Sequence, residues 1–217
     1  MLDQLVALIA PPACGVCGDG CDVGVRLCAR CGSALRRLAP VWSAIPGVDR
    51  TWSAAPYDGA ARELVAALKF GARVGLAEDA AAVIAGRAPA ELLAGTIVPV
   101  PPAPLRSRQR GFDSADAIAM ALARRTGLPL TPCLARTHGR RQVGRRRSER
   151  LADPPRVSAL SPVPAEAIIV DDVMTTGATL GACAEAIRSA GAIRVIAVTL
   201  AASRPVPGPL GIGASRA

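Results

Sequence analysis

Short apolar runs alternate with alanine-rich amphipathic stretches along most of the chain. The spacing predicts helices at Gly59–Phe70, Leu76–Arg87, Ser114–Thr126 and Thr179–Ala190, and strands at Val48–Tyr57, Thr96–Val100, Ala167–Val170 and Ile193–Leu200. Strands that alternate with helices in this way are typical of βαβ units. We therefore predict an α/β fold in which helices flank a parallel sheet.

Composition divides the chain into three parts. Residues 1–40 form a cysteine-rich module, residues 41–202 the α/β domain, and residues 203–217 a tail rich in Pro, Gly and Ser that we expect to be flexible. The module opens with an apolar stretch, Leu2–Ala10, that is far shorter than the roughly 20 residues needed to cross a bilayer. It carries Asp3 where a signal peptide would be positively charged. We therefore predict no membrane span and a cytoplasmic protein.

The charge of the chain points to anionic ligands. Its net charge is +9 and its pI is about 10.1, and Lys69 is the only lysine, so arginine supplies nearly all the positive charge. The planar, forked guanidinium suits phosphate oxygens well. A general compositional bias towards Arg and Ala would give the same excess, so nucleotides, nucleic acids and sugar phosphates all remain open.

The most specific motif is residues 168–180, IIVDDVMTTGATL. An apolar strand is expected to end at two aspartates and to turn through Val173–Thr179 into a helix, where backbone N–H groups and the helix dipole favour a phosphate. The aspartates would accept hydrogen bonds from two ribose hydroxyls, directly or through Mg²⁺. The alternative is an ordinary strand-to-helix turn with Asp and Thr as caps. We predict that a sugar phosphate is bound by Asp171, Asp172, Val173, Met174, Thr175, Thr176, Gly177, Ala178 and Thr179.

Two cysteine pairs near the N-terminus predict a structural zinc site. Cys14 and Cys17, then Cys28 and Cys31, give C-x₂-C-x₁₀-C-x₂-C, which can place four thiolates around one Zn²⁺. A closed Cys₄ site leaves no position for substrate, so the zinc would be structural. A redox C-x-x-C or disulfides are the alternatives, and Cys21 is a spare thiol or an alternative ligand.

Two arginine-rich segments each have two interpretations. Seven arginines crowd into residues 136–150, which form either a solvated basic loop or a surface that follows the phosphates of a polynucleotide or covers a pyrophosphate. Arg106 and Arg110 follow the proline-rich turn after the Thr96–Val100 strand. They would meet the pyrophosphate end of a ligand, or belong to a basic linker.

Taken in order, these segments resemble the ComF (GntX-like) family, phosphoribosyltransferase-like bacterial proteins tied to natural competence and DNA uptake. The marks of the resemblance are the two CxxC pairs, Tyr57-Asp-Gly, Leu68-Lys69-Phe70, Val98-Pro-Val-Pro101, Arg110-Gly-Phe112, Gln142, Glu149-Arg150 and the loop at 170–179. The resemblance implies a type I phosphoribosyltransferase fold. It also implies that Asp171 and Asp172 face the ribose hydroxyls as catalytic residues and that Thr175–Thr179 hold the 5′-phosphate.

The resemblance also suggests which residues flank the site. Lys69, Arg110 and Gln142 correspond to family positions near it, and we add Arg106 and Arg150 as candidates. The chain departs from the family at Asp113 and Ser114, where the family usually has Asn and Gln, at Asp153, where Asn is usual, and at Arg145, where Leu is usual.

Two functions follow as hypotheses. In the first, the protein binds phosphoribosyl pyrophosphate or a nucleotide 5′-phosphate and works in DNA uptake, with single-stranded DNA and DNA-uptake or recombination proteins as partners. In the second, it is an active phosphoribosyltransferase of nucleotide salvage that uses Mg²⁺. The intact loop favours binding, whereas no base-recognition element is evident in the sequence, which weighs against catalysis.

Overall fold

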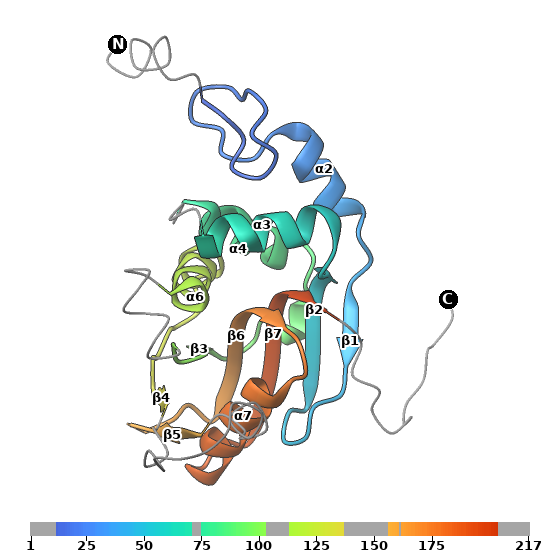
Figure 1. The fold of residues 1–217 in the computed structure, drawn as a ribbon. Coiled ribbons are helices and arrows are strands. Elements are labelled where there is room, and N and C mark those ends of the chain that lie inside the picture. The colour runs from blue at the N-terminus through green and yellow to red at the C-terminus, as the bar shows by residue number, and fades with distance from the viewer. Residues whose placement is uncertain (1–11, 71–74, 103–112, 137–155, 161, 204–217) are drawn as a thin grey trace, which may run out of the picture.

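The computed structural model describes residues 12–70, 75–102, 113–136, 156–160 and 162–203 (Figure 1). The central sheet has the strand order β1-β2-β7-β6-β3. Its strands are β1 (Val41–Ser43), β2 (Arg50–Pro56), β3 (Thr96–Pro99), β6 (Glu166–Met174) and β7 (Arg194–Ala202). Pairing is parallel from β2 through β7 and β6 to β3, and β1 adds an antiparallel edge. The predicted α/β fold with a mostly parallel sheet is confirmed.

Helices cover both faces of this sheet. The helices are α2 (Ala29–Arg37), α3 (Gly59–Phe70), α4 (Leu76–Ala85), α6 (Ser114–Thr126) and α7 (Ala178–Ser189), with a short 3₁₀ turn at Ala90–Leu92. On one face α3, α4 and α6 share a hydrophobic core, and on the other α7 packs with a two-stranded ribbon of β4 (Leu134–Arg136) and β5 (Val157–Ala159).

Strand β6 contributes to both cores in turn. Ile168 and Val170 enter the core beneath α3, α4 and α6, whereas Ala167 and Ile169 enter the core beneath α7. Burial of an Ile or Val side chain stabilises the fold by about 1.5–3 kcal/mol. Residues 167–170 of β6 are therefore fixed between two packed layers, with consecutive side chains pointing to opposite faces.

The elements differ from the sequence prediction in two ways. The prediction that the strand ends at the two aspartates is wrong, because β6 continues to Met174 through parallel pairing of Asp171 with Thr199 and of Val173 with Ala201. The short strands β1, β4 and β5 were not predicted. Helices α3 and α6, in contrast, have the predicted bounds.

The cysteine module packs against the α/β domain. Leu35 of α2 is fully buried in the same core as α3 and α4, and the Arg87 guanidinium donates to the carbonyls of Leu35 and Leu38. A Cβ on Gly15 would lie 2.8 Å from the Leu76 side chain, so the two segments are in close contact. Within the described residues no helix is long and apolar enough to cross a membrane. The apolar stretch Leu2–Ala10 and nearly all of the predicted tail lie outside the described residues.

Candidate functional site

A polar cavity of about 260 Å³ lies beyond the carboxyl ends of β3 and β6. This is the edge of a parallel sheet at which α/β proteins bind ligands. Its lining comes from segments far apart in the sequence, namely Tyr57, Lys69, Val100, Pro101, Pro102, Asp113, Ser114, Ala115, Arg136, Asp171, Asp172, Val173, Thr175 and Thr179. The fold thus brings the two predicted aspartates together with Lys69, which lies about 100 residues earlier in the chain.

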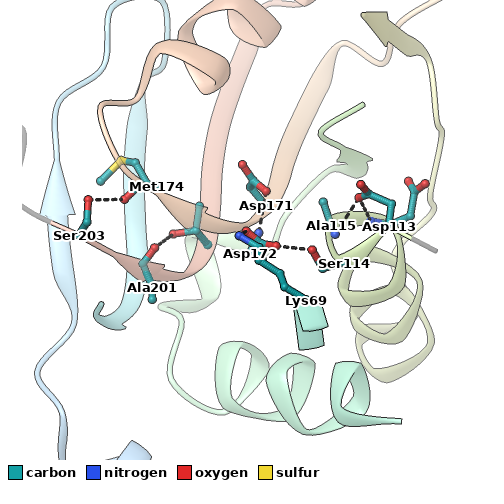
Figure 2. Close-up of polar contacts among 11 residues, drawn as sticks. Lys69, Asp113, Ser114, Ala115, Asp171, Asp172, Met174, Ala201 and Ser203 are labelled. Carbon is teal, nitrogen blue, oxygen red and sulfur yellow. Dashed lines mark hydrogen bonds and ion pairs between the residues drawn. The ribbon is translucent and has the colours of Figure 1, made fainter. Parts of the chain in front are cut away.

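Asp172 is held on the α3 and α6 side of the sheet (Figure 2). Only 4% of the residue is exposed. Its Oδ1 lies 2.7 Å from Lys69 Nζ at the end of α3, and its Oδ2 accepts a hydrogen bond from Ser114 Oγ at the start of α6. An ion pair and a hydrogen bond together compensate for burying this charge.

Asp171 lies on the opposite side of the strand and has a different environment. Its Oδ1 accepts a hydrogen bond from the Asp172 N–H at 2.8 Å. The residue is half-buried. Burial, helped by the negative charge of Asp172, raises the pKa of Asp171 from 3.8 to about 8 against the opposing effects of the Asp172 N–H and Lys69. At neutral pH this carboxyl is therefore mostly protonated.

The loop after β6 forms a second, smaller hollow of about 30 Å³ at the N-terminus of α7. Gly177 occupies the N-cap position with φ of +78°, and a Cβ there would lie 2.9 Å from Ile45. Only glycine fits both conditions without strain. Gly177 has no side chain to cap α7, and the Ala178 N–H donates to Thr176 Oγ1 at 3.4 Å. The first turn of α7 lines the hollow together with Thr175 and Thr176, so its remaining N–H groups are the candidate phosphate donors.

Arg136 is a cavity residue to which the sequence analysis gave no individual role. It ends β4, and its Nε donates to the Pro101 carbonyl at 3.0 Å, which places the guanidinium at the end of β3. In the sequence, Arg136 is the first of the seven arginines in residues 136–150, and no local feature separates it from the other six. Only the return of the β4–β5 ribbon to the sheet brings it to the site.

Asp113 and Ser114 were noted in the sequence only as departures from a family pattern. Asp113 is the N-cap of α6 and accepts hydrogen bonds from the N–H groups of Ala115 and Asp116. Burial raises the pKa of Asp113, and the negative charge of Asp172 adds to this effect. An Asp–Ser pair before an apolar helical face is a capping signal that would have placed both residues at the helix start.

Four other candidates lie outside the described residues, namely Arg106, Arg110, Gln142 and Arg150. The arginine stretch after Arg136 lies outside them as well. Of the predicted flanking residues, the structure therefore places Lys69 alone.

A comparison with known protein families finds a match over the part of the chain that carries much of this site. Residues 115–207 match a family described as phosphoribosyl transferase domain. The match supports a phosphoribosyltransferase family for the chain, and it includes Arg136, both aspartates and the loop to α7. It covers less than half of the 217 residues and leaves out the cysteine pairs and Lys69. It does not test membership of the ComF family, which stays a prediction.

The solved structures that match the chain resemble it only weakly. Glutamine phosphoribosylpyrophosphate amidotransferase from B. subtilis, complexed with ADP and GMP, is 21% identical with a TM-score of 0.39, over 59% of this chain and 26% of that one. Orotate phosphoribosyltransferase from Aeropyrum pernix is 22% identical with a TM-score of 0.37, over 67% of this chain and 66% of that one. The chain thus spans about a quarter of the first protein's length, and at these scores the likeness carries no argument about function. No curated protein matches the chain.

A larger cleft of about 1150 Å³ runs beside α7 but is a poorer candidate for the domain's chemistry. Its lining is mostly apolar and contains none of Asp171, Asp172, Lys69 and Arg136. It touches the phosphate loop only at residues 176–178. Charge and hydrogen-bonding groups gather in the smaller cavity, and we therefore place the candidate site there.

The four predicted cysteine ligands form a compact cluster. The Sγ atoms of Cys14, Cys17, Cys28 and Cys31 all lie within 4.8 Å of one another, as metal coordination requires, and Cys21 is not part of the group. Burial alone would raise the pKa of the Cys14 thiol, but backbone N–H groups, that of Cys28 first, outweigh it and lower the pKa to about 6. A thiolate at neutral pH is the form that binds metal. The four cysteines are therefore positioned to hold a metal ion.

Proposed function

We propose that the phosphoribosyl transferase domain binds phosphoribosyl pyrophosphate, or the 5′-phosphate of a nucleotide, in the cavity beyond β3 and β6. One observation carries the proposal. The phosphate hollow at α7 and the aspartate cavity are adjacent, because Asp171, Val173, Thr175 and Thr179 line both. A ligand with a phosphate at the helix N-terminus would therefore extend its sugar towards the aspartates.

The charges of the cavity support a ligand that arrives with a divalent cation. Because Asp171 is mostly protonated at neutral pH, the negative charges of Asp113 and Asp172 lie against two cations, Lys69 and Arg136. Phosphoribosyl pyrophosphate is strongly anionic, so its own charge would not be balanced by these groups. Mg²⁺ carried by the pyrophosphate would supply the missing positive charge, and Lys69 and Arg136 remain close enough to meet phosphate oxygens.

Titration calorimetry with phosphoribosyl pyrophosphate and Mg²⁺ tests this proposal. The wild-type protein should release or absorb heat with one binding site per chain. Asp172→Ala should weaken binding by about 100-fold, because it leaves Lys69 and Ser114 without their partner and disorganises the cavity. Glu63→Ala, which removes an exposed carboxylate on α3, should bind like wild type. A wild-type protein that gives no heat would rule the proposal out.

Turnover is a separate property from binding, and it distinguishes an active phosphoribosyltransferase of nucleotide salvage from a protein that only binds the ligand. Phosphoribosyl transfer passes through an oxocarbenium-like sugar that needs mainly positioning and charge stabilisation. Release of pyrophosphate in the presence of a set of purine and pyrimidine bases would establish an active phosphoribosyltransferase.

We further propose a ComF-type role in DNA uptake, with single-stranded DNA as a partner. This proposal rests on the resemblance and on the arginine stretch. Affinity for single-stranded DNA should fall steeply as salt rises, and joint neutralisation of Arg145, Arg146 and Arg147 to Gln should weaken it by about tenfold at low salt. A variant with the exposed Arg37, Arg62 and Arg125 changed to Gln carries the same charge change and should lose much less. Equal losses in the two variants would refute the assigned surface.

The ion proposed for the cysteine cluster is Zn²⁺, held as a structural element. Four thiolates satisfy a tetrahedral zinc ion completely and leave no position for a substrate. A reducing compartment would keep these thiols available to metal, which supports the cytoplasm as the location.

A further inference from the structure

The cavity beyond β3 and β6 has one end beside α7 and another beside α6. The residues that it shares with the phosphate hollow mark the α7 end, and they are Asp171, Val173, Thr175 and Thr179. The part of the lining that the hollow does not share includes residues 113–115, at the start of α6, and Arg136. A sugar whose 5′-phosphate lies in the hollow would therefore carry the substituent on its C1 atom towards the α6 end.

Asp113 places a carboxylate at this α6 end. It is the N-cap of α6, and its Oδ1 accepts the N–H groups of Ala115 at 3.0 Å and of Asp116 at 3.3 Å (Figure 2). N–H groups at a helix N-terminus attract anions, and here the side chain of the cap residue itself supplies the anion. The end of the cavity that would receive a pyrophosphate thus already contains a negative charge.

This carboxylate is fixed in position and only partly neutralised. Two backbone bonds to Oδ1 hold the half-buried side chain, and no donor within the described residues is bonded to its Oδ2. Burial raises the pKa of Asp113 and the charge of Asp172 adds to this effect, whereas the Arg136 guanidinium opposes it. Lys69 is paired with Asp172 at 2.7 Å. Among the described residues that line the cavity, Arg136 is therefore the cation left to offset Asp113.

A fixed negative charge at the α6 end distinguishes the two kinds of ligand in the proposed function. Ribose 5-phosphate and the nucleoside 5′-monophosphates carry an uncharged group at C1, whereas phosphoribosyl pyrophosphate carries several negative charges there. Like charges that are close together and partly shielded from water repel each other strongly. Mg²⁺ bound to the pyrophosphate would remove most of this repulsion, because it neutralises the oxygens that face Asp113.

We infer that Asp113 is a specificity-determining residue, whose fixed charge makes the cavity prefer a 5′-monophosphate with an uncharged group at C1 and admit phosphoribosyl pyrophosphate as its Mg²⁺ complex. This inference rests on the proposed function and refines it, because it states which ligand the site binds without a metal. It also gives a role in recognition to a residue outside the loop at 171–179.

Titration calorimetry with ribose 5-phosphate and with phosphoribosyl pyrophosphate, each in Mg²⁺ and in EDTA, tests this inference. In EDTA, wild type should bind ribose 5-phosphate at least about tenfold more tightly than phosphoribosyl pyrophosphate, and Mg²⁺ should remove that difference. Asp113→Asn keeps a side-chain oxygen for the N-cap bonds and removes the charge. It should bind phosphoribosyl pyrophosphate in EDTA about tenfold more tightly than wild type, and ribose 5-phosphate within about twofold.

Two further variants separate the charge of Asp113 from other effects. Asp116→Asn is the matched control, because it removes the same charge from the first turn of α6 but Asp116 does not line the cavity. Its affinity for phosphoribosyl pyrophosphate in EDTA should change by less than about threefold. Asp113→Ser, a second neutral N-cap, should reproduce the gain of Asp113→Asn. Thermal melting verifies that each variant is folded.

Three results would overturn the inference. They are equal binding of the two ligands by wild type in EDTA, no gain in affinity for phosphoribosyl pyrophosphate in either Asp113 variant, and an equal gain in Asp116→Asn. Any of them leaves the proposed function intact as long as wild type binds a sugar phosphate. A wild type that binds neither ribose 5-phosphate nor phosphoribosyl pyrophosphate with Mg²⁺ would overturn the proposed function, and the inference with it.

Discussion

Removal of zinc should unfold the N-terminal module and expose the part of the α/β domain that it covers. Metal binding to four thiolates contributes on the order of 10 kcal/mol in zinc-finger peptides near pH 7, which is more than so short a segment gains from its own core. Cys31→Ser should have the same effect as a chelator, since it removes one of the four clustered thiols.

Metal analysis and limited proteolysis measure this effect. Wild type should carry about one equivalent of zinc and resist trypsin at Arg26 and Arg30, which are paired with Asp79 and Asp19. Cys31→Ser should carry little zinc and be cleaved there at least about tenfold faster. Cys21→Ser is the matched control, because Cys21 is not part of the cluster and its loss should change neither reading. Wild type purified with less than about half an equivalent would contradict the zinc assignment.

Loss of zinc should also destabilise the α/β domain. Leu35 of the module lies in the core beneath α3 and α4, and the side chains of Val16 and Leu27 pack against that core. Unfolding the module would therefore uncover apolar surface, and the melting temperature of the whole protein should fall together with the loss of metal.

Asp171→Asn should stabilise the protein, and the gain should grow as the pH rises. The pKa of Asp171 is raised to about 8 in the folded protein from 3.8. Between these values the folded chain holds a proton that the unfolded chain has lost, so wild-type stability falls as pH rises from about 4 to about 8. Asparagine removes this dependence, and its side-chain carbonyl can still accept the Asp172 N–H. We expect a gain of about 2–4 kcal/mol at pH 8 and almost none at pH 4.

Denaturant unfolding at several pH values measures this gain. The difference in the free energy of unfolding between Asp171→Asn and wild type should increase steadily from pH 4 to pH 8 and then stay constant. Glu63→Gln, an exposed carboxylate removed from α3, should follow wild type throughout. Parallel curves for Asp171→Asn and wild type would mean that the Asp171 carboxyl titrates at its ordinary value. Such a loss of stability at Asp171 would agree with its place in the proposed binding site, because functional sites typically give up stability.

Helix periodicity in the sequence was sufficient to define α3 and α6. Both helices have a regular apolar face, and α6 adds a signal at each end, the Asp113 cap and Gly127 with φ of +72°. Strands β1, β4 and β5 are three residues each, too short to display an alternation. The predicted end of β6 came too early because aspartate is common in turns. The observed end depends on pairing with β7, which a local sequence pattern does not contain.

The candidate site, like the fold, could be predicted from the sequence only in part. The loop at 171–179 could be predicted because strand, carboxylates, hydroxyls, glycine and helix are contiguous in the chain. Arg136 and Ser114 could not be assigned, because only the packing of the β4–β5 ribbon and of α6 against the sheet brings them to the cavity. Adjacency in sequence also suggested one shared role for Asp171 and Asp172, whereas the structure gives them different neighbours. Asp172 contacts Lys69 and Ser114, and Asp171 accepts the Asp172 N–H.

Lys69 gives the protein a natural chemical probe. It is the only lysine among 217 residues, and its side chain, 24% exposed, is the ion-pair partner of Asp172 in the cavity. A reagent selective for side-chain amines therefore has one target in the folded chain, and that target lies in the proposed binding site. The extent of labelling reports directly on whether the cavity is filled, without any engineered label.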